Sequence, residues 1–297
     1  MSPTTDTNIA RRMLGLTLEA MRKQAGISRE AAADAIGLAR STLWKIETGQ
    51  NARLYPVLMQ HLCELYQLTP KETRVITELV KETKASGWWQ AFADDAIPKE
   101  FGLFLSLEDA ADRITSYQIS LLPGLVQTVE YRRAWSWVDF PNKSTDEIER
   151  MLEVSTRRQD RLTRTNKPLT LDAFIDETAL HRVAGSAQIM RAQLHHLTEI
   201  GALPNVSLRV VPQSVGTYRG LLAGVFVILD FPPHPKAELT MPSVVYVQGF
   251  LGDLYLERSD EIRQYRGVCA DIERLALDEA KSRVLILEIA KEYGACT

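Results

Sequence analysis

The chain has 297 residues, which exceeds one average domain, so we expect two domains. A composition of 45% hydrophobic and 25% charged residues is typical of a folded globular protein and excludes a disordered or fibrous one. The net charge of −3 argues against a protein that coats nucleic acid over its whole surface. Because the sequence has neither an apolar run approaching ~20 residues nor the parts of a signal peptide, we expect a cytoplasmic protein with no membrane partner.

Charge is distributed unevenly along the chain. Between Ile9 and Pro70, eight Lys and Arg residues stand against five Asp and Glu, a net charge of +3, which leaves −6 for the remainder. A locally basic end on an acidic body favours a specific DNA-binding head over a general polyanion binder. The three cysteines, 63, 269 and 296, are widely spaced and predict neither a disulfide framework nor a metal site.

The N-terminal part of the chain predicts a small helical head. We expect residues 1–8 to form a disordered tail, followed by a helix from Ile9 to Gln24. The stretch after it predicts two short helices around a tight turn, in which Ser28 caps the first helix, Gly37 makes the turn and Gly49 ends the second.

The second of these short helices, from about Arg40 to Glu47, has two different faces. Its inward side carries Leu43 and Ile46, and Leu38 precedes it. The opposite face and the first turns are polar and cationic, with Arg40, Ser41, Thr42, Trp44 and Lys45. A helix with such a face, held across a sharp turn, can enter the major groove of DNA.

The run from Gly37 to Gly49, which ends in Ile-Glu, one variable residue and Gly, resembles the Cro/repressor or Xre-type helix-turn-helix. The resemblance implies that four residues read base edges of a double-stranded DNA operator: Arg40, Ser41, Thr42 and Lys45. It also implies an ion pair that braces the head, between Arg22 and Glu47.

Three further residues lie at the margins of this face. Arg29 and Arg53 lie at its edges, and we expect them to contact the DNA phosphate backbone. Trp44 either packs along the sugar–phosphate backbone or folds back onto the head. These residues are therefore predicted to affect affinity more than sequence preference.

We divide the rest of the chain at breaks in its pattern. The head spans residues 9–70, a connector helix with an aromatic anchor spans 71–100, and the body spans 101–297. The aromatic residues Trp88, Trp89, Phe92 and Phe101 either anchor the connector on the body or line a ligand pocket.

The body predicts an α+β fold with one small sheet. Helices are expected at 103–122, from Thr128 to Trp137, at 146–165, at 189–200 and within 260–293, with a helix N-cap at Asp278. We interpret the arginines at 157, 158, 161 and 164 as a solvated face of the helix at 146–165. Strands are expected at 169–175, 207–211, 225–229, 244–247 and 254–256.

Short motifs in the body resemble the C-terminal domain of Xre-type regulators of the WhiJ kind. These motifs are Pro123-Gly124-Leu125-Val126-Gln127-Thr128, Tyr131, Glu177-Thr178-Ala179-Leu180, Gln193-Leu194, Pro204-Asn205-Val206, Val211-Pro212, Gly216 and Tyr246. Such regulators are described as antitoxin-like and often have a small partner protein. The resemblance implies a body that binds a small-molecule effector or a small protein partner.

The sequence lacks a convincing constellation for catalysis. His195 and Glu199 share a helix face, but no third metal ligand is evident. We interpret Asp172 and Asp176 as strand-end polarity, and the loop at 216–220 as either the edge of a cleft or an ordinary connection. We therefore predict no enzyme activity, no metal and no cofactor.

Together these features favour a DNA-binding transcription regulator, acting as a homodimeric repressor. One recognition helix reads only a few base pairs, so a dimer on a palindromic site doubles the contacts. Two alternatives remain: an antitoxin whose main task is to neutralise a small partner, with autoregulatory DNA binding, and an enzyme fused to a DNA-targeting head.

Overall fold

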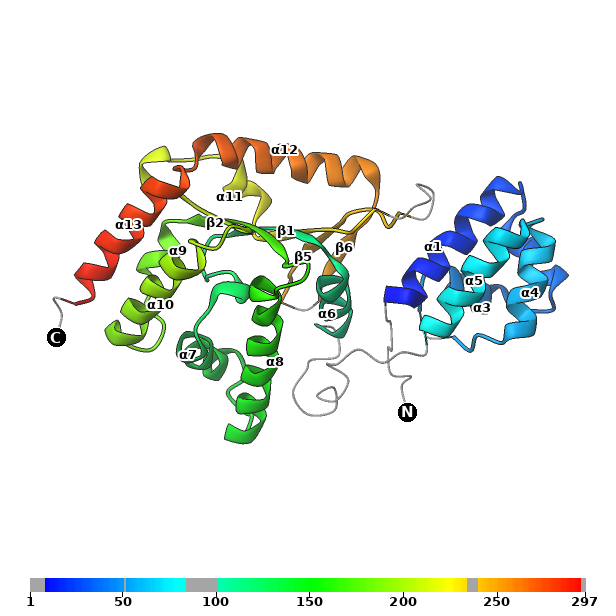
Figure 1. Ribbon diagram of the computed structural model, residues 1–297, viewed down its shortest axis with the longest axis horizontal. Helices are drawn as coiled ribbons and strands as arrows, with labels where there is room; N and C mark the ends of the chain where they lie inside the picture. The colour runs from blue at the N-terminus through cyan, green and yellow to red at the C-terminus, as the bar shows by residue number, and fades with distance from the viewer. Residues whose placement is uncertain (1–8, 51, 84–100, 234–239, 251, 295–297) are drawn as a thin grey trace. The chain divides into compact units, whose positions relative to one another are not determined.

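The computed structural model describes residues 9–50, 52–83, 101–233, 240–250 and 252–294 (Figure 1). The chain forms two compact units, Met1–Ala110 with Pro233–Met241, and Ala111–Pro232 with Pro242–Thr297. None of the helices in the described ranges combines the length and the apolar character that crossing a membrane requires.

Five helices form the N-terminal head, and the first three lie where the sequence predicts them. They are α1 (Ile9–Gln24), α2 (Arg29–Ala35), α3 (Arg40–Glu47), α4 (Pro56–Leu65) and α5 (Pro70–Glu82). Their apolar sides meet in one core, which includes Leu14, Leu18, Leu43, Leu62 and Ile76. Because α5 contributes Ile76, Leu79 and Val80, the core of the head extends beyond residue 70, into the helix that we expected to act as a connector.

Local sequence signals fix the two short helices of the head. The Ser28 hydroxyl accepts a hydrogen bond from the N–H of Ala31 at 3.1 Å, so it caps α2 as predicted. Gly37 has a φ of +67° and makes the turn between α2 and α3. Gly49 also has positive φ, and a Cβ atom there would lie 2.7 Å from the Cα of Arg12, so this close approach requires glycine.

The body contains one mixed sheet of six strands, which confirms the predicted α+β class. The strands are β1 (Arg113–Gln118), β2 (Thr170–Asp176), β3 (Val206–Val211), β4 (Phe226–Asp230), β5 (Val244–Val247) and β6 (Leu254–Leu256). Their order is β3-β2-β1-β4-β5-β6. The first three strands run parallel to one another, and the pairings of β4, β5 and β6 are antiparallel.

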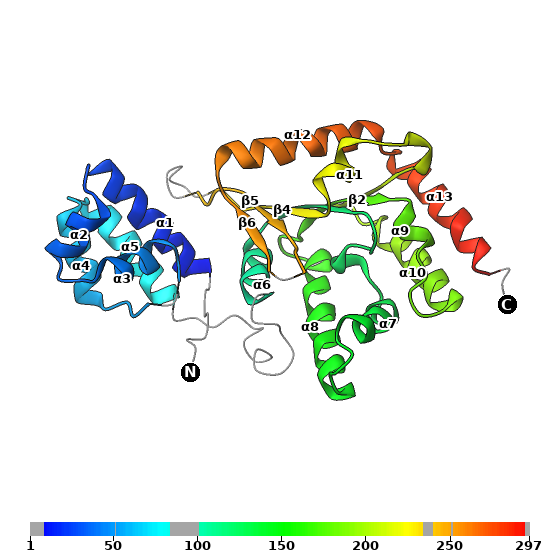
Figure 2. The same ribbon diagram turned by 180° about the vertical axis from the view of Figure 1, so that it is seen from behind.

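Helices cover both faces of this sheet. In the two opposite views, α7 (Val129–Asp139), α8 (Thr145–Thr163) and α10 (Ala187–Ile200) lie on one side, and α11 (Arg219–Ala223) and α12 (Ser259–Leu275) lie on the other (Figures 1 and 2). The remaining elements are α6 (Phe101–Ala110), α9 (Thr178–His181), α13 (Glu279–Glu292) and two short turns, η2 (Gly124–Val126) and η3 (Gln213–Val215). The expected N-cap is present, since the Asp278 carboxylate accepts from the N–H of Lys281 at 2.7 Å.

The prediction of one helix over 103–122 is wrong. Helix α6 ends at Ala110, and β1 begins three residues later as a strand in the middle of the sheet, between β2 and β4. The segment carries β-branched and aromatic residues at Ile114, Thr115 and Tyr117, which favour a strand. Ile114 and Tyr117 are almost completely buried, so packing against neighbours that are distant in sequence decides the conformation.

The interpretation of the α8 arginines as a solvated face is also wrong for two of them. Arg158 and Arg161 are 5% and 8% exposed. The Nη2 group of Arg161 donates to the carbonyl oxygen of Ala111 at 2.6 Å, just before β1. These arginines therefore contribute to the internal structure of the body, whereas Arg157 is exposed.

Candidate nucleic-acid interface

Helix α3 presents its polar face to solvent. Leu43 and Ile46 are buried in the head core, while Arg40, Ser41, Trp44 and Lys45 are exposed and Thr42 is half-buried. Trp44 keeps 42% of its surface exposed, so its indole is not packed into the core of the head. The residues that the sequence assigned to base reading thus lie together on one helix, with their side chains near its accessible face.

The end of α3 is fixed by the expected ion pair. Arg22 Nε lies 2.6 Å from Glu47 Oε1, and Arg22 Nη2 lies 3.1 Å from Glu47 Oε2, so the contact is bidentate. The Glu47 side chain is fully buried and that of Arg22 is 7% exposed. Arg22 also donates to the carbonyl of Ile27 at 2.8 Å, and its hydrogen bond to Glu47 raises the pKa of the guanidinium. The brace thereby joins three parts of the head: α1, α3 and the segment that precedes α2.

Arg29 is part of the same network, which the sequence analysis did not predict. Its Nε lies 2.7 Å from Glu47 Oε2, and its Nη2 lies 3.2 Å from Glu19 Oε1. We expected Arg29 to contact phosphate, but in this structure its guanidinium is engaged with two carboxylates inside the head. The sequence reasoning assigned a single partner to Glu47, and no residue spacing indicated the second one.

The loop after α3 carries Arg53, which is exposed as expected for a phosphate contact. Its Nη1 lies 3.5 Å from the hydroxyl of Tyr55, which is itself 55% exposed. The loop is tied to the first helix, since Arg11 Nη1 donates to the carbonyl of Ala52 at 2.9 Å. Arg53 therefore extends from a segment that the head holds in place.

The body residues singled out for chemistry have separate structural partners. Tyr218 donates to Asp176 Oδ2 at 2.6 Å, and the hydroxyls of Tyr218 and Tyr117 lie 2.5 Å apart. Burial raises the pKa of Tyr117 to about 12. Asp172 instead forms an ion pair with Arg113 at 2.6 Å. The two aspartates thus have different partners. Asp176 is the last residue of β2, as the interpretation of strand-end polarity predicts, whereas Asp172 is its third residue, so that interpretation is wrong for Asp172.

Two neighbouring histidines lie on α10. His196, rather than His195, approaches Glu199, with 4.0 Å between Nδ1 and Oε2, and burial lowers the pKa of His196. Within the described parts of the chain, no three His, Cys, Asp or Glu side chains are grouped so that they could hold a metal ion.

The structure gives a physical role to two motifs of the body. Gln193, on α10, is fully buried; its Oε1 accepts from the N–H of Thr128 at 2.6 Å, and its Nε2 donates to the carbonyl of Val126 at 2.8 Å. Gln127 donates to the carbonyl of Leu122 at 2.6 Å. The motifs at 123–128 and 193–194 therefore form one hydrogen-bonded unit. This unit holds the turn that precedes α7 against α10.

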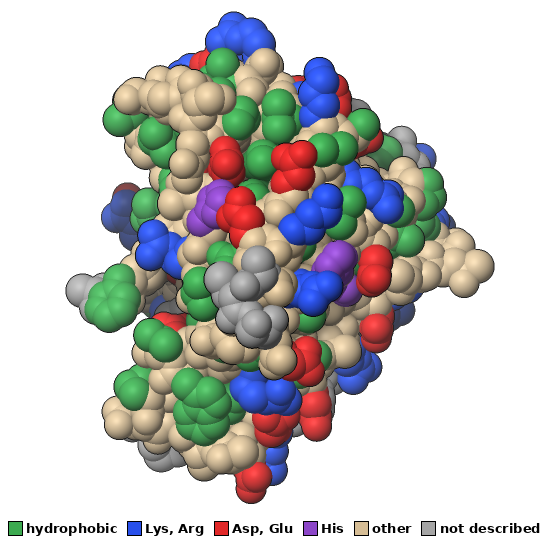
Figure 3. All heavy atoms as spheres, turned by 90° about the vertical axis from the view of Figure 1, so that its left-hand side faces the viewer, with side chains coloured by type: hydrophobic (Ala, Val, Ile, Leu, Met, Phe, Trp, Pro, Cys, Tyr) green, Lys and Arg blue, Asp and Glu red, His purple; other side chains and the backbone are tan. Residues whose placement is uncertain are grey.

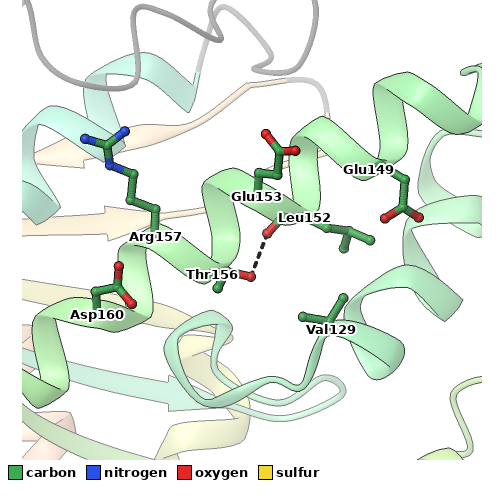
Figure 4. A pocket seen from close by; sticks show the side chains of 7 residues that line it. All are labelled: Val129, Glu149, Leu152, Glu153, Thr156, Arg157 and Asp160. Atoms are coloured by element: carbon green, nitrogen blue, oxygen red, sulfur yellow. Dashed lines mark hydrogen bonds between the residues drawn. The ribbon is translucent and has the colours of Figure 1, made fainter.

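A groove of about 430 Å³ lies between α7 and α8 (Figure 4). Val129 and Leu152 provide its apolar part, and Glu149, Glu153 and Asp160 are among its polar side chains. On the face of the molecule in Figure 3, acidic and basic side chains are interspersed and neither sign forms a continuous patch.

The sequence analysis also offered a ligand pocket lined by Trp88 and Trp89. These two residues lie outside the residues that the structure describes.

The capped α2, the glycine turn and the exposed face of α3 define the head formed by α1 to α5 as a helix-turn-helix domain. The comparison with protein families agrees, since residues 13–76 match a family described as a helix-turn-helix domain. Residues 101–288 match a domain of unknown function, DUF5753, and the chain belongs to this family. No curated protein matches the chain. The helix-turn-helix match indicates DNA binding, and the function of the C-terminal domain is unknown.

Proposed function

We propose that the chain is a sequence-specific DNA-binding transcription regulator that acts as a dimeric repressor. The observation that carries this proposal is the construction of α3. One side of the helix is held by the buried carboxylate of Glu47, and the other side exposes Arg40, Ser41 and Lys45. A helix fixed in this way can place its polar side chains against base edges in the major groove.

The length of the reading helix supports the proposed dimer. Helix α3 has eight residues, and a single helix of this kind contacts only a few base pairs. Two copies on a palindromic operator double the contacts and raise sequence preference. The proposed operator therefore has two half-sites about 10–10.5 base pairs apart, or a multiple of this spacing.

For the body, we propose binding of a small molecule or a small protein partner rather than catalysis. The buried Asp176 and Gln193 are engaged in hydrogen bonds that hold the fold together, which supports a structural use for them. If an occupant of the body changes DNA affinity by some factor, operator DNA must change the affinity for that occupant by the same factor. This reciprocity distinguishes a regulatory body from one that is merely attached.

Selection from a random duplex library with the full chain tests the proposed function. We expect enrichment of an inverted repeat, and footprinting should show protection of both half-sites by one dimer. Binding that depends only on duplex length and salt concentration, with no enriched sequence, would contradict it. A purified chain that turned over a nucleotide, peptide or ester would contradict the non-enzymatic role of the body.

A further inference from the structure

Glu30 and Arg40 contact each other across the turn of the helix-turn-helix. Glu30 lies in the first turn of α2, and Arg40 is the first residue of α3. Arg40 Nη1 lies 2.6 Å from Glu30 Oε1, and the two side chains are 68% and 63% exposed. A carboxylate beside the proposed DNA-reading face repels the phosphates of DNA, so by itself it lowers the affinity of the head for any duplex.

The contact leaves room for base recognition. It involves one guanidinium nitrogen, Nη1, whereas an arginine side chain has five N–H donors in a planar fork. A guanine base accepts two hydrogen bonds from such a fork, at O6 and N7. Arg40 can therefore keep its bond to Glu30 while it reads guanine. The bond also restricts the rotamers of Arg40 before DNA binds, which reduces the entropy lost on binding.

The charge of Glu30 acts differently on the two modes of DNA binding. Binding to arbitrary sequences depends mainly on neutralising phosphates with Lys and Arg. Glu30 offsets the charge of Arg40 and repels nearby phosphates, so it weakens that mode. At the correct sequence, the hydrogen bonds from Arg40 to a base compensate for this repulsion.

We propose that Glu30 is a positioning residue that makes Arg40 selective for guanine at the expense of affinity for arbitrary DNA. The proposal rests on the regulator function proposed above and deepens it. It assigns a role in sequence discrimination to an acidic side chain that does not itself need to touch DNA.

The test compares Glu30→Gln with the wild-type chain on two duplexes, the selected operator and a scrambled duplex of equal length and composition. The matched control is Glu78→Gln, which removes the same charge from an exposed position on α5. For Glu30→Gln we expect tighter binding to the scrambled duplex, with a salt dependence steeper by roughly one unit in log–log slope. The ratio of operator to scrambled affinity should fall by about tenfold. Glu78→Gln should leave this ratio unchanged.

Two further measurements separate positioning from a general charge effect. In operators changed one base pair at a time, Glu30→Gln should lose preference only at the guanine that Arg40→Ala also affects. In an Arg40→Ala background, Glu30→Gln should produce no further fall in the ratio. Thermal unfolding of each variant checks that the head is folded, and Glu30→Ala provides a second substitution at the site.

An unchanged affinity ratio in folded Glu30→Gln and Glu30→Ala would overturn the role of Glu30, as would an equal fall in the Arg40→Ala background. These failures differ from failure of the proposed function. If the wild-type chain itself bound all duplexes alike, the regulator proposal would fail, and the role of Glu30 with it.

Discussion

Arg29 and Arg22 donate to the same carboxylate oxygen, since Arg29 Nε lies 2.7 Å and Arg22 Nη2 lies 3.1 Å from Oε2 of Glu47. Glu47 is the last residue of α3, whereas Arg22 lies near the end of α1 and Arg29 begins α2. One buried carboxylate therefore connects three helices of the head. The orientation of α3 depends on this connection as well as on the apolar core beneath it.

Replacing Glu47 by Gln should strongly destabilise the head. The change removes the closer charged partner of the buried Arg22 guanidinium and leaves only the longer contact of 3.9 Å to Glu19 Oε1. Breaking a buried ion pair in this way costs about 3–5 kcal/mol. Urea unfolding of the chain, followed by a spectroscopic probe placed in the head, measures the loss in the free energy of unfolding. The control is Glu64→Gln, because Glu64 lies on the exposed side of α4. Equal stability of these two variants would show that the Glu47 brace contributes little.

Replacing Arg29 by Ala and Arg53 by Ala should affect DNA binding in different ways. Arg53 is exposed on the loop after α3, so its loss should weaken all sequences alike and make the log–log salt dependence shallower by about one unit. Arg29 is engaged with Glu47 and Glu19, so its loss should lower the midpoint of thermal unfolding and leave the salt dependence close to that of the wild type. If Arg29→Ala instead made the salt dependence shallower, the result would support the original prediction that Arg29 contacts phosphate.

Replacing Tyr218 by Phe should destabilise the body. The substitution removes the hydroxyl that donates to Asp176 and contacts Tyr117, and it leaves a buried carboxylate oxygen without this donor. Loss of one partner of a buried polar group costs about 1–3 kcal/mol. Chemical unfolding followed by tryptophan fluorescence measures the change. The matched control is Tyr255→Phe on β6, and a loss no greater than that of the control would contradict the role of this hydrogen-bonded chain.

The features that the sequence predicts correctly are those that depend on neighbouring residues. Ser28 and Asp278 cap helices through groups three residues away, and Gly37 supplies the left-handed turn that a non-glycine residue adopts with difficulty. The face of α3 follows in the same way from helical periodicity. Such signals involve residues within one or two helical turns of each other, so they can be recognised in the sequence without knowledge of the fold.

The features that the sequence analysis missed depend on contacts between distant segments. Strand β1 pairs with residues 170–175 and 226–230. The sequence analysis predicted a helix here, because these pairing partners are distant in sequence. Arg29 reaches Glu47 across 18 residues, and Arg161 reaches Ala111 across 50. The conformation of β1 and the roles of these two arginines are thus set by partners that one sequence alone does not identify.

The assignment of base contacts to α3 makes the most direct prediction. Arg40 and Lys45 lie on its exposed side, in the first and last turns of a helix whose other side is fixed in the core. If either side chain bonds a guanine, its replacement by Ala should cost about 1–3 kcal/mol at the selected operator and relax the preference at one base pair. Titration of labelled duplexes, each altered at one position, measures both effects. Arg53→Ala serves as the comparison, because a phosphate contact lowers affinity without changing the preferred bases. Folded Arg40→Ala and Lys45→Ala variants that kept wild-type affinity and base preference would show that another element reads the operator.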